Sequence, residues 1–332
     1  MTGRRGVACA GNWILDIVHD ISAWPEKSEL VRILGQTSGL GGGAANVAAN
    51  LVAMGANYPV VPIGLIGTDF IGDEVLAHCK AAGLDTARIV QTEAAATSQS
   101  HVMNLPGDSR TFFYHPGAND LLSSAHIDVD ALAASYLRIL YIGYINLLAG
   151  LDKTGPNGRP VAADVLADAR SAGIMTCIDL VSSHSATYHD TVFGVLPEVD
   201  ILFLNEVEAA RATGLAINGE TDDAGMIRAA KALADGGVRR AVIMHSAARV
   251  VWMEAGDAMI HVPQKVPAAN ILSPVGAGDA FAAGVIHGLH EGWSRDAAIN
   301  LGCRAARACL GAQTATGGLG RDLLHPPPTD QT

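Results

Sequence analysis

The sequence predicts an α/β protein in which helices cover both faces of a mostly parallel sheet. Short apolar runs alternate with segments of helical periodicity along most of the chain, which is typical of sheets built from strand–helix–strand units. The 332 residues are 49% hydrophobic and only 17% charged, enough for one large α/β domain with a small appendage or for two domains.

The expected elements follow one another in this alternating order. Strands are expected where short runs are almost wholly apolar, and helices where apolar residues recur every three or four positions, as at Phe281, Val285 and Leu289. The expected strands are 6–10, 58–63, 138–142, 174–178, 201–204 and 241–244, and the expected helices are 44–54, 72–82, 161–172, 226–235, 279–290 and 295–310.

Two further segments break the alternation. Residues 31–38 and 97–114 look like isolated β structure, and the second reads as a hairpin around the polar turn 106–109. At the other end of the chain, the prolines in 326–332 cannot extend a helix, so we expect a loose tail there.

Charge and cysteine usage narrow the class of protein. The formal net charge is −11, and no basic cluster is present, so nucleic acid and anionic membranes are poor candidate partners. The longest apolar region, 137–151, is shorter than a membrane span and contains Arg138 and Asn146. The five cysteines are scattered, with no Cys-x-x-Cys pair, as in a reducing compartment. We therefore expect a cytoplasmic protein.

The segment 273–279, Ser-Pro-Val-Gly-Ala-Gly-Asp, carries the clearest chemical signal. Its Gly-Ala-Gly turn has no bulky side chain and precedes an apolar helix, so backbone N–H groups and the helix dipole can meet an anion. The acid that ends the turn, Asp279, can take a proton from an attacking hydroxyl. The alternative is a plain strand–turn–helix whose acid caps the helix and binds nothing.

A second motif and a third favour the chemical interpretation. Residues 41–55 open a helix with three glycines and close it with one, and Leu-Asn-Glu-Val-Glu at 204–208 ends an apolar strand. With 64–73 and 273–279, these motifs resemble, in order and separation, the ribokinase-like (PfkB-type) family of sugar and nucleoside kinases. The resemblance covers about 11–311. It implies a three-layer α/β/α sandwich that forms one domain, 1–325, with a small β lid from segments about 13–39 and 96–118.

The resemblance also implies catalytic roles in the 273–279 segment. Asp279 matches the acid that accepts the proton of a sugar hydroxyl as it attacks the terminal phosphate of ATP. The amides of Gly276, Ala277 and Gly278 match the family's anion hole, which holds the migrating phosphoryl charge.

Asn205 and Glu208 match the family's Asn-x-x-Glu motif, which organises Mg²⁺ and the phosphates of ATP, often through water. Magnesium prefers oxygen ligands and keeps several waters, so one carboxylate and one amide suffice. The alternative is a capping box at a helix start, with Asn205 as the cap and Glu208 as its return partner. Both interpretations can hold for the same pair.

The substrate site is expected from two other segments. Asp16 matches the family acid that accepts hydrogen bonds from two substrate hydroxyls, and Asn12 matches a polar position used by adenosine-kinase-like members. Gly42 and Gly43 let the backbone approach the sugar, and Asn46 can reach it with its amide.

The nucleotide pocket is less well marked. Asn300 matches a polar position that approaches adenine in several members, and His245 lies where it can contact phosphate or ribose; a plain polar helix or strand-end residue is the alternative for each. The sequence departs from the family pattern at Ser273 and Pro274 and in 242–249, where many members have other residues. The preferred nucleotide is therefore open.

The leading hypothesis is an ATP- and Mg²⁺-dependent kinase that phosphorylates a sugar hydroxyl. A nucleoside kinase is the nearest alternative, because Asn12 and Trp13 also suit an adenosine-type site. A non-catalytic sugar-binding protein on the same scaffold is the third. We expect a homodimer that forms through the lid, because a small exposed sheet has open edges.

Overall fold

The computed structural model describes residues 3–105 and 110–324. Across these residues the main sheet has nine strands in the order β13-β12-β11-β10-β9-β8-β1-β4-β5. Neighbours from β11 to β5 are parallel, whereas β12 and β13 are antiparallel additions at one edge. The strands are β1 Val7–Gly11, β4 Val60–Gly67, β5 Ile89–Thr92, β8 Ile139–Ile145, β9 Met175–Leu180, β10 Ile201–Leu204, β11 Ala241–His245, β12 Val250–Glu254 and β13 Asp257–His261.

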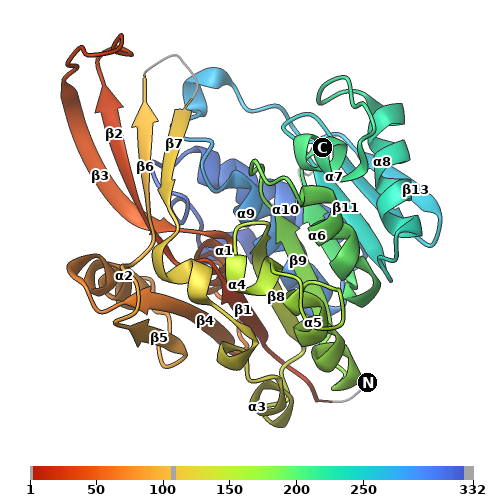
Figure 1. Ribbon diagram of the computed structural model, residues 1–332. Coiled ribbons are helices and arrows are strands. Elements are labelled where there is room, and N and C mark those ends of the chain that lie inside the picture. The colour runs from red at the N-terminus through yellow and green to blue at the C-terminus, as the bar shows by residue number, and fades with distance from the viewer. Residues whose placement is uncertain (1–2, 106–109, 325–332) are drawn as a thin grey trace.

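Helices cover both faces of this sheet, which makes three layers (Figure 1). One face carries α1 Gly43–Ala53, α2 Phe70–Ala81, α9 Ala277–Glu291 and α10 Arg295–Leu310. The other carries α3 Val129–Ala134, α4 Ala149–Asp152, α5 Val161–Ser171, α6 Tyr188–Val195, α7 Glu206–Thr213 and α8 Asp223–Asp235. Short 3-10 turns occupy Gly117–Leu121, Ser124–His126, Leu196–Glu198, Ala268–Asn270 and Arg321–Leu324.

The alternation of side chains along each strand explains why two cores form. In β1, Val7 and Cys9 are fully buried against the α1/α9 layer, and Ala8 and Ala10 are fully buried against the opposite layer. Successive side chains of a strand point to opposite faces, so a strand buried on both faces must be apolar throughout. This is why the sequence shows continuous apolar runs at the central strands.

A second, smaller sheet projects from one end of the main sheet (Figure 1). We call it the small sheet; its strands, in the order β3-β2-β6-β7, are β2 Ile14–Ile21, β3 Ile33–Gly41, β6 Gln99–Asn104 and β7 Arg110–His115. β2 and β6 are parallel, and the two outer pairs are antiparallel. Only residues 12 and 13 separate β2 from β1, so the small sheet is tied directly to the carboxyl end of a central strand.

The direction of chain winding changes between β1 and β8. The helices after β1 and β4 lie on one face, whereas those after β8, β9 and β10 lie on the other. Parallel sheets bind ligands in the crevice at the carboxyl ends of the strands, where the winding reverses. The carboxyl ends of β1 and β8 are therefore the place to look for a site.

The six strands and six helices expected from sequence are all present, with boundaries displaced by a few residues. Missed elements include β2, β5, the β12–β13 hairpin, α3 and α6. The second β segment forms the antiparallel pair β6–β7, as expected. The expected turn at 106–109 and the whole of the expected tail, 326–332, lie outside the described residues. The division into one domain with two inserted lid segments stays a prediction.

Candidate active site

The carboxylate of Asp279 lies at the centre of the candidate site, buried in the first turn of α9. Its Oδ1 accepts a hydrogen bond from the Tyr144 hydroxyl at 2.6 Å, and its Oδ2 accepts one from the Asn46 side chain at 2.8 Å. Burial raises the pKa of Asp279 to about 6, although both hydrogen bonds oppose this by stabilising the charged form. The cap of α9 is Gly276, so the alternative that Asp279 is the helix cap is wrong.

The turn before Asp279 requires small residues. Gly276 has φ of 80°, and a Cβ on it would collide with Ala315. A Cβ on Gly278 would lie 3.0 Å from Cε1 of His245. The first amides of a helix have no partners within the helix and point outward. Gly276 and Gly278 therefore present backbone donors beside Asp279, at the positive end of a 15-residue helix, and the N–H of Ala277 makes a long bond of 3.4 Å to the Pro274 carbonyl.

Asp16 lies on β2 of the small sheet, close enough to Asp279 for the two carboxyl groups to interact. It pairs in register with Gly39 and Ser100, and a Cβ on Gly41 would collide with its carboxylate. Burial, and then the nearby charge of Asp279, raise the pKa of Asp16 to about 7. Two acids thus converge, one from the first turn of α9 and one from the small sheet.

Asn12 and Asn46 play different parts. The side chain of Asn12 is fully buried; its Oδ1 accepts from the backbone N–H of Tyr144 at 2.6 Å, and its Nδ2 donates to the Leu147 carbonyl at 3.0 Å. Both polar atoms of the Asn12 side chain therefore bind the protein's own backbone. Asn46 holds Asp279 through Nδ2, and its buried Oδ1 has no protein partner, which leaves an acceptor at the site.

Gly42 and Gly43 are glycines for steric reasons. Gly42 is the cap of α1 with φ of 95°, and a Cβ there would lie 2.5 Å from the Asn12 carbonyl oxygen. A Cβ on Gly43 would lie 2.8 Å from Cε1 of Tyr144. Both positions bring α1 close to the ends of β1 and β8.

Tyr144 and Asp179 belong to the site but were not among the residues expected to bind or react. Tyr144 lies in β8, and Asp179 lies in β9, where it accepts a bond from Tyr141 at 3.3 Å. Burial, and then the charge of Asp279, raise the pKa of Asp179 well above its ordinary value. The signal for both was available: polar side chains that end central strands of a parallel sheet.

Asn205 and Glu208 form the capping box at the start of α7. The Asn205 Oδ1 accepts from the Glu208 N–H at 2.8 Å, and the Glu208 Oε2 accepts from the Asn205 N–H at 2.8 Å. Glu208 Oε1 also accepts from Ser182 at 3.0 Å and from the Asn205 amide at 2.8 Å. The capping interpretation is confirmed. Every oxygen of the pair already has a donor, which disfavours direct ligation of a metal but leaves contact through water open.

The two remaining nucleotide candidates differ in position. His245 ends β11 with its ring 5.1 Å from that of Phe281, and its buried Nε2 has no protein partner. Burial lowers its pKa to about 4, so it is neutral. Asn300 is exposed on α10, about 15 Å along the helix from the end at Leu310 that reaches the site. The structure brings His245, but not Asn300, to the other site residues.

Arg110 joins the small sheet to the segment that precedes the Gly-Ala-Gly turn. Arg110 on β7 donates from Nη1 to the Ser273 hydroxyl at 2.6 Å and from Nη2 to the Leu272 carbonyl at 3.3 Å. Its Nε donates to Asn104 at 3.1 Å, and Asn104 donates to Asp20 at 2.6 Å. The residues paired with Asp16 share a face with Arg110, so this face of the small sheet covers the site.

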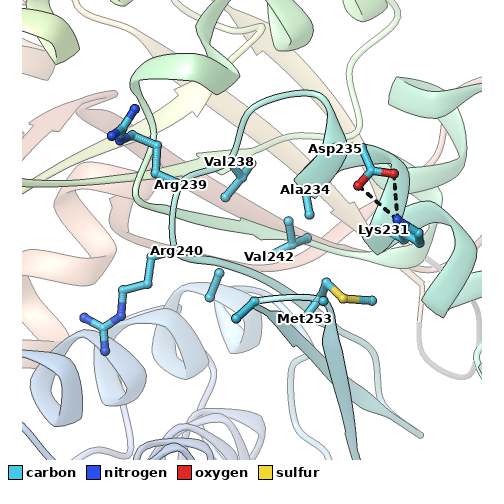
Figure 2. Close-up of a pocket in the computed structure, with 11 residues that line it drawn as sticks. Lys231, Ala234, Asp235, Val238, Arg239, Arg240, Val242 and Met253 are labelled. Atoms are coloured by element: carbon cyan, nitrogen blue, oxygen red, sulfur yellow. Dashed lines mark hydrogen bonds and ion pairs between the residues drawn. The ribbon is translucent and has the colours of Figure 1, made fainter.

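One surface pocket lies elsewhere. It is at the start of β11, beside the β12–β13 turn and the end of α8, where Lys231 and Asp235 form an ion pair (Figure 2). This is the edge of the sheet opposite to the carboxyl ends of the strands, so it is separate from the site around Asp279.

Comparison with known proteins gives the class to which this fold and site belong. The family described as pfkB family carbohydrate kinase matches residues 5–319. The chain belongs to the pfkB family of carbohydrate kinases. It is therefore a phosphotransferase that acts on an alcohol group of a sugar.

Named relatives agree with this class. The chain is 25% identical over 289 residues to a 5-dehydro-2-deoxygluconokinase of Clostridium perfringens, covering 83% of this chain and 80% of that one. It is 28% identical over 294 residues to a 1-phosphofructokinase of Rhodobacter capsulatus, covering 88% and 83%. An adenosine kinase of Saccharomyces cerevisiae is 23% identical over 267 residues, covering 79% and 75%.

Solved structures confirm the fold. A ribokinase from Giardia lamblia superposes with a TM-score of 0.81 at 17% identity, covering 96% of this chain and 98% of that one. Arabidopsis thaliana ribokinase complexed with ribose and ATP gives 0.76 at 20% identity, covering 96% of each. The expected ribokinase-like α/β/α fold is thus confirmed. Among the described residues, none of the helices combines the length and apolar character that crossing a bilayer demands.

Proposed function

We propose that this chain transfers the terminal phosphoryl group of ATP to a hydroxyl of an unphosphorylated sugar bound between Asp16 and Asp279. The observation that carries the proposal is the position of a buried, hydrogen-bonded carboxylate beside the turn 276–278, where the N–H of Ala277 makes only a long bond of 3.4 Å to the Pro274 carbonyl. Asp279 takes the proton as the sugar oxygen bonds to phosphorus and the bond from phosphorus to the ADP oxygen breaks. The amides and the helix dipole stabilise charge on the migrating group.

Magnesium fits this site as a companion of the ATP phosphates. The residues present suit an ion held through water, because both oxygens of Glu208 already accept hydrogen bonds and Asn205 caps α7. Mg²⁺ keeps several waters and needs few protein ligands when phosphates supply the rest. When bound, the ion neutralises phosphate charge. Asn205 and Glu208 would orient its waters.

The structure removes the sequence argument for a nucleoside substrate. That argument rested on Asn12 and Trp13, and both are used internally: Trp13 is fully buried and its Nε1 donates to the Ile63 carbonyl at 2.9 Å. The paired acceptors of Asp16 match a vicinal diol, which free sugars and ribonucleosides both carry, so the substrate panel below must separate these two classes.

The substrate class is tested by measuring ADP release with each of a panel of pentoses, hexoses, keto-sugars, inositols and nucleosides. We expect turnover with at least one free sugar and none with nucleosides. Asp279→Asn protein is the matched blank, because it removes the base and keeps the shape of the side chain. Turnover with nucleosides alone would refute a sugar acceptor, and binding of sugars without any turnover would refute catalysis.

Asp16→Ala is expected to raise the KM for the sugar at least tenfold and to change the KM for ATP little. The substitution removes acceptors for two sugar hydroxyls in the small sheet, whereas ATP lies with the amides of 276–278. Initial rates measured with each substrate varied in turn give both constants. Equal rises in the two KM values would show that Asp16 supports the fold rather than the sugar.

A homodimer through the small sheet is the second part of the proposal. Four large apolar side chains of this sheet are exposed, by 53% to 65% of their surface: Ile33, Leu34, Phe112 and Phe113. Exposed apolar side chains at open strands favour pairing with a second copy. Sedimentation at micromolar concentration should give a dimer, and Ile33→Asp with Phe113→Asp should give a monomer. A wild-type monomer would contradict this assembly.

A further inference from the structure

Tyr144 is the residue of the site with the least expected position. It lies in β8, and its hydroxyl donates to Oδ1 of Asp279 at 2.6 Å. Its side chain is only partly buried, and the charges of Asp279, Asp179 and Asp16 all act on it. Hydrogen bonds to a carboxylate are stronger than those between neutral groups, so this bond is a strong one.

The backbone of Tyr144 is held in place from β1. The Asn12 N–H donates to the Gly143 carbonyl at 2.9 Å, and the Tyr144 N–H donates to Asn12 Oδ1 at 2.6 Å. The same Asn12 side chain donates to the Leu147 carbonyl at 3.0 Å. One buried asparagine thus fixes both sides of the segment that carries the tyrosine.

The ring of Tyr144 packs against α1 at Gly43, which has no side chain. A Cβ on Gly43 would lie 2.8 Å from Cε1 and 3.0 Å from Cδ1 of the ring, distances at which the ring must move. Gly43 is therefore needed to admit Tyr144, in addition to any approach of the backbone to the sugar.

We propose that Tyr144 is a positioning residue, which orients the Asp279 carboxylate and favours its ionised form so that the base is ready for the substrate hydroxyl. This inference rests on the proposed function, because it assigns a second group to the same proton transfer. Asn46 binds Oδ2, Tyr144 binds Oδ1, and a lone pair remains for the proton of the sugar.

Burial opposes ionisation of Asp279, and the hydrogen bond from Tyr144 acts against this effect of burial. The charge of Asp279 in turn acts on Asp16 from β2, Asp179 from β9, Tyr141 and Tyr144 from β8, and Cys309 from α10. Two of these are acids, and burial and then the charge of Asp279 raise the pKa of each. Burial, and then the charge of Asp279, raise the pKa of Tyr144 well above its ordinary value, so the phenol keeps its proton and stays a donor.

The test is the pH dependence of kcat/KM for Tyr144→Phe, because this ratio reports the ionisation of the free enzyme. Loss of a hydrogen bond to the charged form should move the acid limb up by about one pH unit, so the activity deficit should be about tenfold larger at pH 5.5 than at pH 8. Gly43→Ala, which displaces the ring, should move the limb in the same direction.

Tyr58→Phe is the matched control. Its buried hydroxyl is 3.0 Å from Nδ1 of His287, near the other end of α9, so this variant loses a similar bond away from Asp279. Its acid limb should coincide with that of the wild type. An unshifted limb in Tyr144→Phe, beside an inactive Asp279→Asn, overturns the role of Tyr144 alone. An active Asp279→Asn overturns the proposed function itself.

Discussion

Asp279→Asn is expected to lower kcat by about two to four orders of magnitude while the protein still folds and binds its sugar. The amide has the shape of the carboxylate but cannot take the proton of the attacking hydroxyl, and loss of a general base has an effect of this size. In the wild type, turnover should also fall as the pH drops below about 6, because burial raises the pKa of Asp279 to about 6 and only the ionised base accepts the proton.

The value of kcat is measured by steady-state kinetics with one substrate varied at a time. The affinity for the sugar is measured separately by calorimetry. Asp152 offers a matched control, since burial raises the pKa of its carboxyl to about 6 as well, but it accepts bonds only from the N–H groups of Asn146 and Leu148 in a loop after β8. Asp152→Asn should keep most of the turnover. If Asp279→Asn kept more than about a tenth of wild-type kcat, proton transfer would have to be assigned to another group.

The second large effect concerns stability. Relative to the wild type, Asp279→Asn should gain on the order of 3 kcal/mol of unfolding free energy between pH 4 and pH 8, from a pKa raised by about two units at 1.36 kcal/mol each. The folded-state pKa lies above the unfolded value, so the wild-type folded state holds the proton between about pH 4 and 6 and loses stability as the pH rises through this window. The asparagine variant has no such loss.

Denaturant unfolding of the ligand-free proteins at several pH values measures this difference. The comparison must be between variants, because buried histidines titrate in the opposite sense: burial lowers the pKa of His245 to about 4, so it loses stability as the pH falls. A difference between Asp279→Asn and wild type that stayed constant across the pH range would mean that Asp279 is ionised as readily in the fold as in water.

Local features of the site were predictable from the sequence, and features set by tertiary contact were not. Asp279, its Gly-Ala-Gly turn and the Asn205–Glu208 cap depend on neighbours within a few residues, and the structure places them as the patterns indicate. The bond from Tyr144 to Asp279 joins positions 135 residues apart, and no periodicity signals it.

The misplaced expectations have the same cause. Asn12 was expected to face the substrate, but its amide binds the backbone of Tyr144 at the end of β8 and of Leu147 just after it, 132 and 135 residues away. β2 was missed as a strand because it carries Asp16, His19 and Asp20 within its apolar run, and those polar residues are explained only by partners on other strands.

In the proposed reaction, Arg110 would couple the binding of the two substrates. Its guanidinium binds Ser273 and Leu272, just before the amides proposed to receive ATP, while its own strand belongs to the sheet that carries Asp16. A sugar that fixes the position of this sheet would also fix the segment before the proposed ATP-binding turn, because Arg110 holds the two together. The two ligands should then bind with positive cooperativity, and the factor by which sugar tightens ATP must equal the factor by which ATP tightens sugar.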